Sequence, residues 1–264
     1  MMSRVCVALA VLGVVAAGCG RATIEVVLEE EFTVEGDLVV DVLLPRGDIT
    51  VETHEGEEVL VSATASLAGG SEDERAAFAA APPLRITQDG TGVRVRFDLR
   101  AEARGEATID LRLVLPVVCD LELHTGRGDI TVHGVHGTVS VASERGDIEL
   151  RDLEATLTAT TGRGIVIAHG QLLAGEHTVR SSGGRIELWL RHDTCARILA
   201  ETTKGKIEDS NLLVRGARQP KAWDVSTYCS SGGGFQVSDD PPATIHLLAD
   251  PGNIYLLTWY DEED

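Results

Sequence analysis

Three copies of the tetrapeptide Arg-Gly-Asp-Ile are the residues of this sequence with the most evident capacity for chemistry. They occupy positions 46–49, 127–130 and 145–148. The last two copies place the carboxylates of Asp129 and Asp147 in equivalent positions of a repeat. Paired carboxylates are the catalytic groups of most glycoside hydrolases, and an exposed Arg-Gly-Asp loop is also able to bind cell-surface receptors. The motif therefore raises a glycan-cleaving site and a receptor-binding loop as hypotheses.

A structural role explains the same tripeptides more simply. Glycine permits the backbone bend, and aspartate tolerates a turn and bonds nearby backbone groups. On adjacent coils, Arg127, Asp129, Arg145 and Asp147 are placed to pair diagonally. The sequence has no Gly-x-Ser-x-Gly motif, no phosphate-cradling loop and few insertions with which to wall a cleft. We therefore predict structural turns and no enzymatic activity.

The eight histidines raise the question of a metal site. His133 and His169 each follow a repeat glycine by five residues, and His136 lies close to the first of them. Arg151 holds the equivalent position in the coil between, and a guanidinium opposes a metal ion. A zinc site needs at least three ligands, and no third ligand is evident. We predict no metal and no cofactor.

The glycines of the tripeptides belong to a longer series. From Gly128 onward the steps between them are 18, 18, 20, 21, 29 and 18 residues. A period of this size is typical of stacked coils. We predict that one glycine makes the bend in each coil, namely Gly47, Gly128, Gly146, Gly164, Gly184, Gly205, Gly234 and Gly252.

The residues two places after each glycine are apolar in nearly every coil, and polar residues alternate with them. This period of two is typical of half-buried strands. Helical crossovers between parallel strands need ten or more residues, for which an 18-residue period leaves no room. The predicted fold is all-β, a parallel β-helix or β-solenoid, with an inward column of Ile130, Ile148, Val166, Ile186, Ile207, Gln236 and Ile254.

Residues 35–115 are rich in strand patterns but less regular, and we predict that they form the opening coil and an N-terminal cap. Within them Ser71 and Glu74 have the spacing of a capping box that opens a short helix. Asp89-Gly90-Thr91-Gly92 is typical of a hairpin turn. Residues 116–260 are predicted to form the solenoid repeats, interrupted by a surface loop between residues 210 and 223.

The N-terminus has the layout of a bacterial lipoprotein signal. Residues 1–18 join a basic start to a short apolar run, and small residues precede Cys19, where we predict lipidation. Cleavage by ordinary signal peptidase remains the alternative. Residues 19–34 are then an anchor and linker, and residues 261–264 an acidic tail. Removing residues 1–18 removes one cation, Arg4, and changes the net charge from −19 to −20, which disfavours nucleic acid as a partner.

Three cysteines remain once the signal is removed and Cys19 is acylated. They are Cys119, Cys195 and Cys229. Sequential stacking of the repeats places them on different coils, and cysteines with Cα atoms more than about 7 Å apart do not bridge. We expect buried thiols.

The segments Leu43–Val51 and Leu113–Pro116, with successions such as Gly-Asp-Ile-Thr-Val and Gly-Asp-Ile-Glu-Leu, resemble a family of bacterial envelope proteins named for a suggested adhesin role. The resemblance spans roughly residues 35–257. It implies a right-handed β-helix, often secreted or lipidated, in a domain of unknown function. The chain departs from the pattern at Ile165 and Lys206, where the acidic residue of the turn is replaced.

Repeat and resemblance together predict a lipid-anchored, non-catalytic adhesion or interaction module of the bacterial envelope, at the outer membrane, the periplasmic face or the cell surface. An envelope glycan or protein is the expected partner. The alternative is an envelope sensor or accessory subunit that binds a membrane protein, and a polysaccharide-cleaving enzyme is the least favoured hypothesis. The predicted contact surface consists of Arg127, Asp129, Arg145, Asp147, Arg163, Arg185 and Lys206.

Overall fold

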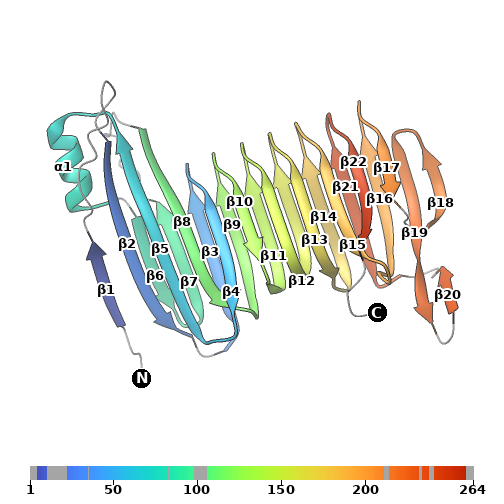
Figure 1. The fold of residues 1–264 in the computed structure, drawn as a ribbon, viewed down its shortest axis with the longest axis horizontal. Helices are drawn as coiled ribbons and strands as arrows, with labels where there is room; N and C mark the ends of the chain where they lie inside the picture. Colours follow the sequence, from blue (N-terminus) through green and yellow to red (C-terminus); the bar gives the residue numbers. More distant parts are fainter. Residues whose placement is uncertain are drawn as a thin grey trace. The chain divides into compact units, whose positions relative to one another are not determined.

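A computed structural model describes residues 5–10, 23–34, 36–82, 84–97, 106–210, 214–231, 234–237 and 241–259. Over these ranges the chain is made of β-strands and a single short helix (Figure 1). It divides into two compact units, Met1–Gly128 and Asp129–Asp264. The predicted all-β class is therefore confirmed. Cys19 and the acidic tail lie outside the described residues.

The first unit contains two sets of paired strands. In one set β2, β5 and β8 are antiparallel, and β4 runs parallel to β8. In the other, β3 lies between β7 and β9 and is parallel to both, while β6 and β7 form a hairpin. The strands are β1 (Val5–Ala10), β2 (Thr23–Thr33), β3 (Leu38–Leu44), β4 (Ile49–His54), β5 (Glu58–Ala68), β6 (Leu84–Asp89), β7 (Gly92–Phe97), β8 (Glu106–Pro116) and β9 (Cys119–Thr125).

Two local signals of this unit are confirmed. Ser71 caps helix α1 (Glu72–Ala80), and its hydroxyl accepts from the Glu74 amide at 3.2 Å. The Glu74 carboxylate in turn accepts from the Ser71 amide at 2.6 Å, which completes the capping box. The β6–β7 hairpin turns at Gly90, whose φ of 62° lies in the left-handed region.

Residues 5–10 fall within the predicted signal peptide. They form β1, which is paired antiparallel with β2. Processing at Cys19 stays a prediction, and it would remove β1 from the mature chain. Among the described residues no helix has the length and apolar character needed to span a membrane.

The second unit is a stack of parallel strands in register. Ile130, Ile148, Val166 and Ile186 are successive Cα partners, and all four side chains are buried. The predicted inward column is thus confirmed over these coils. The strands are β10 (Ile130–His133), β11 (His136–Ser143), β12 (Ile148–Thr161), β13 (Val166–Leu172), β14 (Gly175–Ser181), β15 (Ile186–Arg191), β16 (Ala196–Thr202), β17 (Ile207–Ser210), β18 (Val214–Gln219), β19 (Ala222–Ser231), β20 (Gly234–Val237), β21 (Ala243–Ala249) and β22 (Ile254–Trp259).

The coils of this unit do not follow one another in sequence order. Strand β21 lies between β14 and β16, and β22 lies between β15 and β17, parallel to both neighbours in each case. The C-terminal strand pair is therefore inserted into the stack, as Figure 1 also shows. In the inward column Ile254 separates Ile186 from Ile207.

A hairpin explains the insertion. Strand β19 pairs antiparallel with β16 and with β18, so it occupies the edge of β16 on which a next coil would otherwise form. The chain then returns to pair between two earlier coils. The predicted surface loop at residues 210–223 is replaced, over its described part, by β18 and the turn into β19. The 29-residue step from Gly205 to Gly234 is therefore not a coil of the stack, because the hairpin and β20 occupy it.

Two predicted column positions are wrong for the same reason. Gly234 pairs with Ser231, and Gln236 with Cys229, in the antiparallel β19–β20 pair. Gly252 takes the turn position between Gly184 and Gly205. A Cβ built on Gly205 would lie 1.8 Å from the Gly252 carbonyl oxygen, and one on Gly252 would lie 1.9 Å from that of Gly184.

The cysteine prediction is confirmed in one place and wrong in another. Cys119 is a buried free thiol, and burial raises its pKa to about 12. Cys195 is disulfide-bonded. Its separation from other cysteines was inferred from sequential stacking, and the hairpin after β17 breaks that sequence.

Candidate functional site

Two aspartates of the Arg-Gly-Asp turns accept hydrogen bonds from backbone amides of the next coil. Asp129 Oδ1 accepts from the Asp147 amide at 2.7 Å, and Asp147 Oδ1 accepts from the Ile165 amide at 2.7 Å. At the other end of the stack, Asn253 Oδ1 accepts from the Lys206 amide at 3.0 Å. These contacts make the aspartates structural, since the turn amides would otherwise lack a protein partner. They argue against a catalytic pair at Asp129 and Asp147.

A second ladder at the turns was missed by the sequence reasoning. A buried hydroxyl three residues before the turn glycine donates to a glycine carbonyl of the neighbouring coil. Thr161 Oγ1 lies 2.8 Å from the Gly146 oxygen, and Ser181 Oγ lies 2.8 Å from the Gly164 oxygen. The signal was present in the sequence, because the turn glycines at 128, 146, 164, 184 and 205 are all preceded at this distance by serine or threonine, namely Thr125, Ser143, Thr161, Ser181 and Thr202.

The predicted contact surface is exposed. Arg127 and Asp129 lie at the end of one unit and the start of the other. Within the second unit, Arg145, Arg163 and Arg185 project from successive turns, and Arg185 pairs with Glu187 on its own coil. These three arginines form the turn column, an exposed row of guanidinium groups on successive turns. All seven predicted residues have exposed side chains: Arg127, Asp129, Arg145, Asp147, Arg163, Arg185 and Lys206.

Two histidines, His133 and His169, lie around one carboxylate at the opposite bend of the coils. His133 Nε2 lies 2.7 Å from Asp152 Oδ2, and His169 Nδ1 lies 3.4 Å from Asp152 Oδ1. His169 also packs against Trp259 in a tilted arrangement, with 4.7 Å between ring centres. Arg151 is the Cα partner of His133, as predicted, but the group between the imidazoles is the Asp152 carboxylate. Among the described residues, no three acidic, histidine or cysteine side chains are arranged to hold a metal ion.

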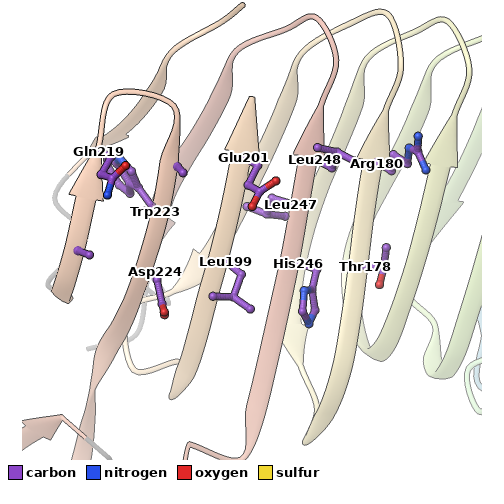
Figure 2. A pocket seen from close by; sticks show the side chains of 12 residues that line it. Thr178, Arg180, Leu199, Glu201, Gln219, Trp223, Asp224, His246, Leu247 and Leu248 are labelled. Atoms are coloured by element: carbon purple, nitrogen blue, oxygen red, sulfur yellow. The ribbon is translucent and has the colours of Figure 1, made fainter. Parts of the chain in front are cut away.

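A groove of about 550 Å³ lies on the outer face of the sheet formed by β14, β21, β16 and β19, and strand β18 contributes lining residues at one end. Figure 2 shows side chains from these neighbouring strands along it. Leu199 and Leu248 are half-buried on this face, among polar and charged residues and two alanines. The lining residues are Thr178, Arg180, Leu199, Glu201, Ala217, Gln219, Ala222, Trp223, Asp224, His246, Leu247 and Leu248.

Ion pairs fix part of this lining. Arg197 donates to Asp224 through Nε at 2.9 Å and Nη2 at 2.8 Å, and these hydrogen bonds lower the pKa of the Asp224 carboxyl. His246 Nε2 lies 2.9 Å from Glu176 Oε2. The groove therefore holds Asp224 as a carboxylate and positions the His246 ring.

Sequence reasoning did not find the groove. Its floor combines Leu248 from the inserted C-terminal strand with Leu199 from β16, and sequential stacking does not bring these two strands together. Each leucine occupies an outward position of its strand, where a polar residue is usual for an exposed face. An apolar residue at that position was the one available signal.

His177 is a titratable group buried in the core of the second unit. Its Nδ1 accepts from the Leu157 amide at 3.1 Å, so the proton lies on Nε2, which donates to the Leu173 oxygen at 2.8 Å. The coil that contains His177 is 20 residues long, and the ladder of β12 passes from β13 to β14 at Leu157. The imidazole thereby supplies a hydrogen-bond acceptor for the Leu157 amide at the point where β12 changes partner from β13 to β14. Burial lowers the pKa of His177.

We expect His177 to make folding stability depend on pH. Because its folded pKa lies below the ordinary 6.5, the unfolded chain binds the proton more readily, and stability is lost as pH falls below 6.5. This residue adds at most about 1.4 kcal/mol per pH unit to the slope. Urea unfolding of wild type and His177→Leu between pH 7.5 and 5 measures the difference. Parallel stability curves for the two proteins would contradict the assignment.

The in-register parallel strands of the second unit define a β-solenoid-like protein. The chain belongs to the Toastrack DUF4097 family, whose model matches residues 36–222. This membership confirms that the chain belongs to a domain family of unknown function, as the resemblance implied.

Three solved structures are similar to this chain, and each alignment covers 88% of it. A candidate cell adhesion protein from Clostridium sporogenes ATCC 15579 is 14% identical over 99% of its own length, with a TM-score of 0.48. A candidate adhesin from Bacteroides fragilis NCTC 9343 is 12% identical over 97% of its own length, with a TM-score of 0.40. A second candidate adhesin, from Parabacteroides distasonis ATCC 8503, is 10% identical over 97% of its own length, with a TM-score of 0.35. No functionally curated protein matches the chain.

Proposed function

We propose that this protein is a lipid-anchored, non-catalytic interaction module of the bacterial cell envelope. Acylation of Cys19 holds it at the membrane, and a right-handed parallel β-helix presents its outer faces to an envelope partner. Adhesion to envelope or cell-surface material is the activity that we assign. The turn column of exposed arginines and the groove over β14, β21, β16 and β19 are the surfaces available for it.

The observation that carries the proposal is the contrast between the two kinds of surface residue. The aspartates of the repeated turns are engaged with backbone amides, so the repeat supports the fold. The groove, in contrast, places charged and apolar side chains together on an exposed face where the backbone is already paired. Such a surface suits binding of a partner more than covalent chemistry.

Cys19→Ala tests the anchor. If acylation of Cys19 holds the protein, the variant moves from the membrane fraction to the soluble fraction when cells are broken and centrifuged. Acyl chains give stable anchoring because each buried methylene contributes about 0.8 kcal/mol. A variant that stays in the membrane fraction would show that the anchor prediction is wrong.

Retention on isolated cell envelopes tests the binding role. Purified protein without its acyl chains is expected to sediment with whole-cell envelopes and to be released by soluble envelope polysaccharide. Loss of retention after protease treatment of the envelopes would instead point to a protein partner, which is the sensor or accessory-subunit alternative. Absence of sedimentation would contradict the adhesion role.

A further inference from the structure

Outward side chains of the groove lie in two rows that cross the strands. One row contains Thr178, His246, Leu199 and Asp224, which are successive Cα partners on β14, β21, β16 and β19. The next row, two residues along each strand, contains Arg180, Leu248, Glu201 and Ala222. Strand β18 extends the groove with Ala217 and Gln219. At about 4.8 Å per strand, five strands give a track roughly 19 Å long.

The centre of the track is apolar, and hydrogen-bonding groups surround it. Leu199 and Leu248 are half-buried on neighbouring strands, in adjacent rows. Arg180 and Glu201 stand on either side of Leu248, and both are exposed. Within the described part of the chain, no hydrogen bond or ion pair engages either of these two side chains. A ligand thus meets an unused guanidinium and an unused carboxylate.

This combination matches the chemistry of a sugar ring. The C–H face of a pyranose is apolar and gains from contact with leucine methyl groups. Its hydroxyl groups donate to carboxylates and accept from guanidinium, amide and imidazole N–H groups. Glu201 and Asp224 are acceptors in the groove, Arg180 and Gln219 are donors, and His246 offers Nδ1 as a further acceptor because its Nε2 donates to Glu176. Hydrogen bonds with charged groups of this kind are among the stronger ones in proteins.

Other ligand classes fit less well. The central strands β14, β21, β16 and β19 are each paired on both sides, so an extended peptide lying over them finds no free backbone ladder to join there. Anionic polymers meet two carboxylates in the groove and a chain with a net charge of −19. A neutral ligand rich in hydroxyl groups avoids both difficulties.

We propose that the groove over β14, β21, β16, β19 and β18 binds a short stretch of neutral polysaccharide lying across the strands, with sugar rings packed on Leu199 and Leu248. This inference rests on the proposed function, because it names the ligand class of an interaction surface given there. The turn column of arginines plays no part in it.

The test is titration of the full chain, with leucine methyl groups labelled, by maltotetraose, cellotetraose and chitotetraose, with tetragalacturonate as the anionic comparison. At least one neutral tetrasaccharide is expected to shift the Leu199 and Leu248 methyl signals, with a Kd of about 1 mM or tighter. Leu199→Arg fills the groove and should abolish the shifts at Leu248. Glu201→Gln should weaken binding about tenfold.

Glu208→Gln is the matched control, because it makes the same change on an exposed position of β17, which over the described residues pairs with β22 and with none of the strands of the groove. It should leave the affinity unchanged. The proposal is overturned if no neutral tetrasaccharide shifts the two leucine signals, if tetragalacturonate binds more tightly than the neutral sugars, or if Leu199→Arg binds normally. Retention on envelopes without sugar binding at the groove would overturn this inference alone, whereas groove binding without retention would contradict the adhesion role alone.

Discussion

Ile148→Asp lowers the free energy of unfolding by about 4 kcal/mol or more, because a carboxylate is placed in the core without a partner. Ile148 is 1% exposed. Its Cα partners are Ile130 and Val166, both fully buried, so the new charge has no path to solvent between coils. Urea unfolding monitored by circular dichroism measures the change.

Thr158→Asp is the control for this substitution. Thr158 lies on the same strand, β12, with an exposed outward side chain, and its Cα partners Ser140 and Thr178 are uncharged. We expect a change within about 0.5 kcal/mol there. Equal effects of the two substitutions would show that burial in the column is not what distinguishes Ile148.

Gly164→Ala is expected to cost about 3 kcal/mol or more, because the added Cβ meets backbone of the neighbouring coil. A Cβ at this position would lie 2.0 Å from the Gly146 carbonyl oxygen and 2.6 Å from its carbon. Backbone atoms held in a parallel ladder cannot move aside as a side chain does, so the two coils must separate locally. The same unfolding measurement gives the loss.

Gly90→Ala separates this effect from simple backbone strain. Gly90 has a φ of 62° in the β6–β7 hairpin, and nothing lies within 4 Å of a Cβ built on it. Alanine there should cost only about 1 kcal/mol, the penalty of the left-handed conformation. A Gly164→Ala variant as stable as Gly90→Ala would contradict the close stacking of turn glycines.

The periodic part of the fold was predictable because each coil needs the same features, namely apolar side chains that face inward and a glycine in the turn. The alternation around Ile130, Ile148 and Val166 fixes which side chains face inward. The glycine in the turn follows from the close approach of neighbouring backbones. The start of helix α1 was equally predictable, because the side chains and amides of Ser71 and Glu74 complete a capping box.

The order of the last coils was not predictable from the repeat. Ile207 and Ile254 satisfy the same column equally well, and either one is able to pair next to Ile186. The choice depends on the hairpin at residues 214–231, which pairs with β16 through antiparallel contacts that the parallel period does not reveal. Long-range pairing of this kind decided which residues line the groove.

The candidate site was predictable only in part, for the same reason. The exposed arginines of the turns follow directly from the repeat. The groove requires Leu248 beside Leu199, and these residues are neighbours only after the C-terminal strands insert. The carboxylate between His133 and His169 depends on the bend at Asp152, a non-glycine residue with a φ of 50°.

Methyl–methyl nuclear Overhauser effects among the isoleucines of the inward column test the inserted stack most directly. Neighbouring strands are about 4.8 Å apart, so Ile254 should show contacts with both Ile186 and Ile207. Ile186 and Ile207 are two strand spacings apart, about 9.6 Å, and should show none. A direct contact between Ile186 and Ile207, with Ile254 beyond them, would contradict the inserted order and with it the groove.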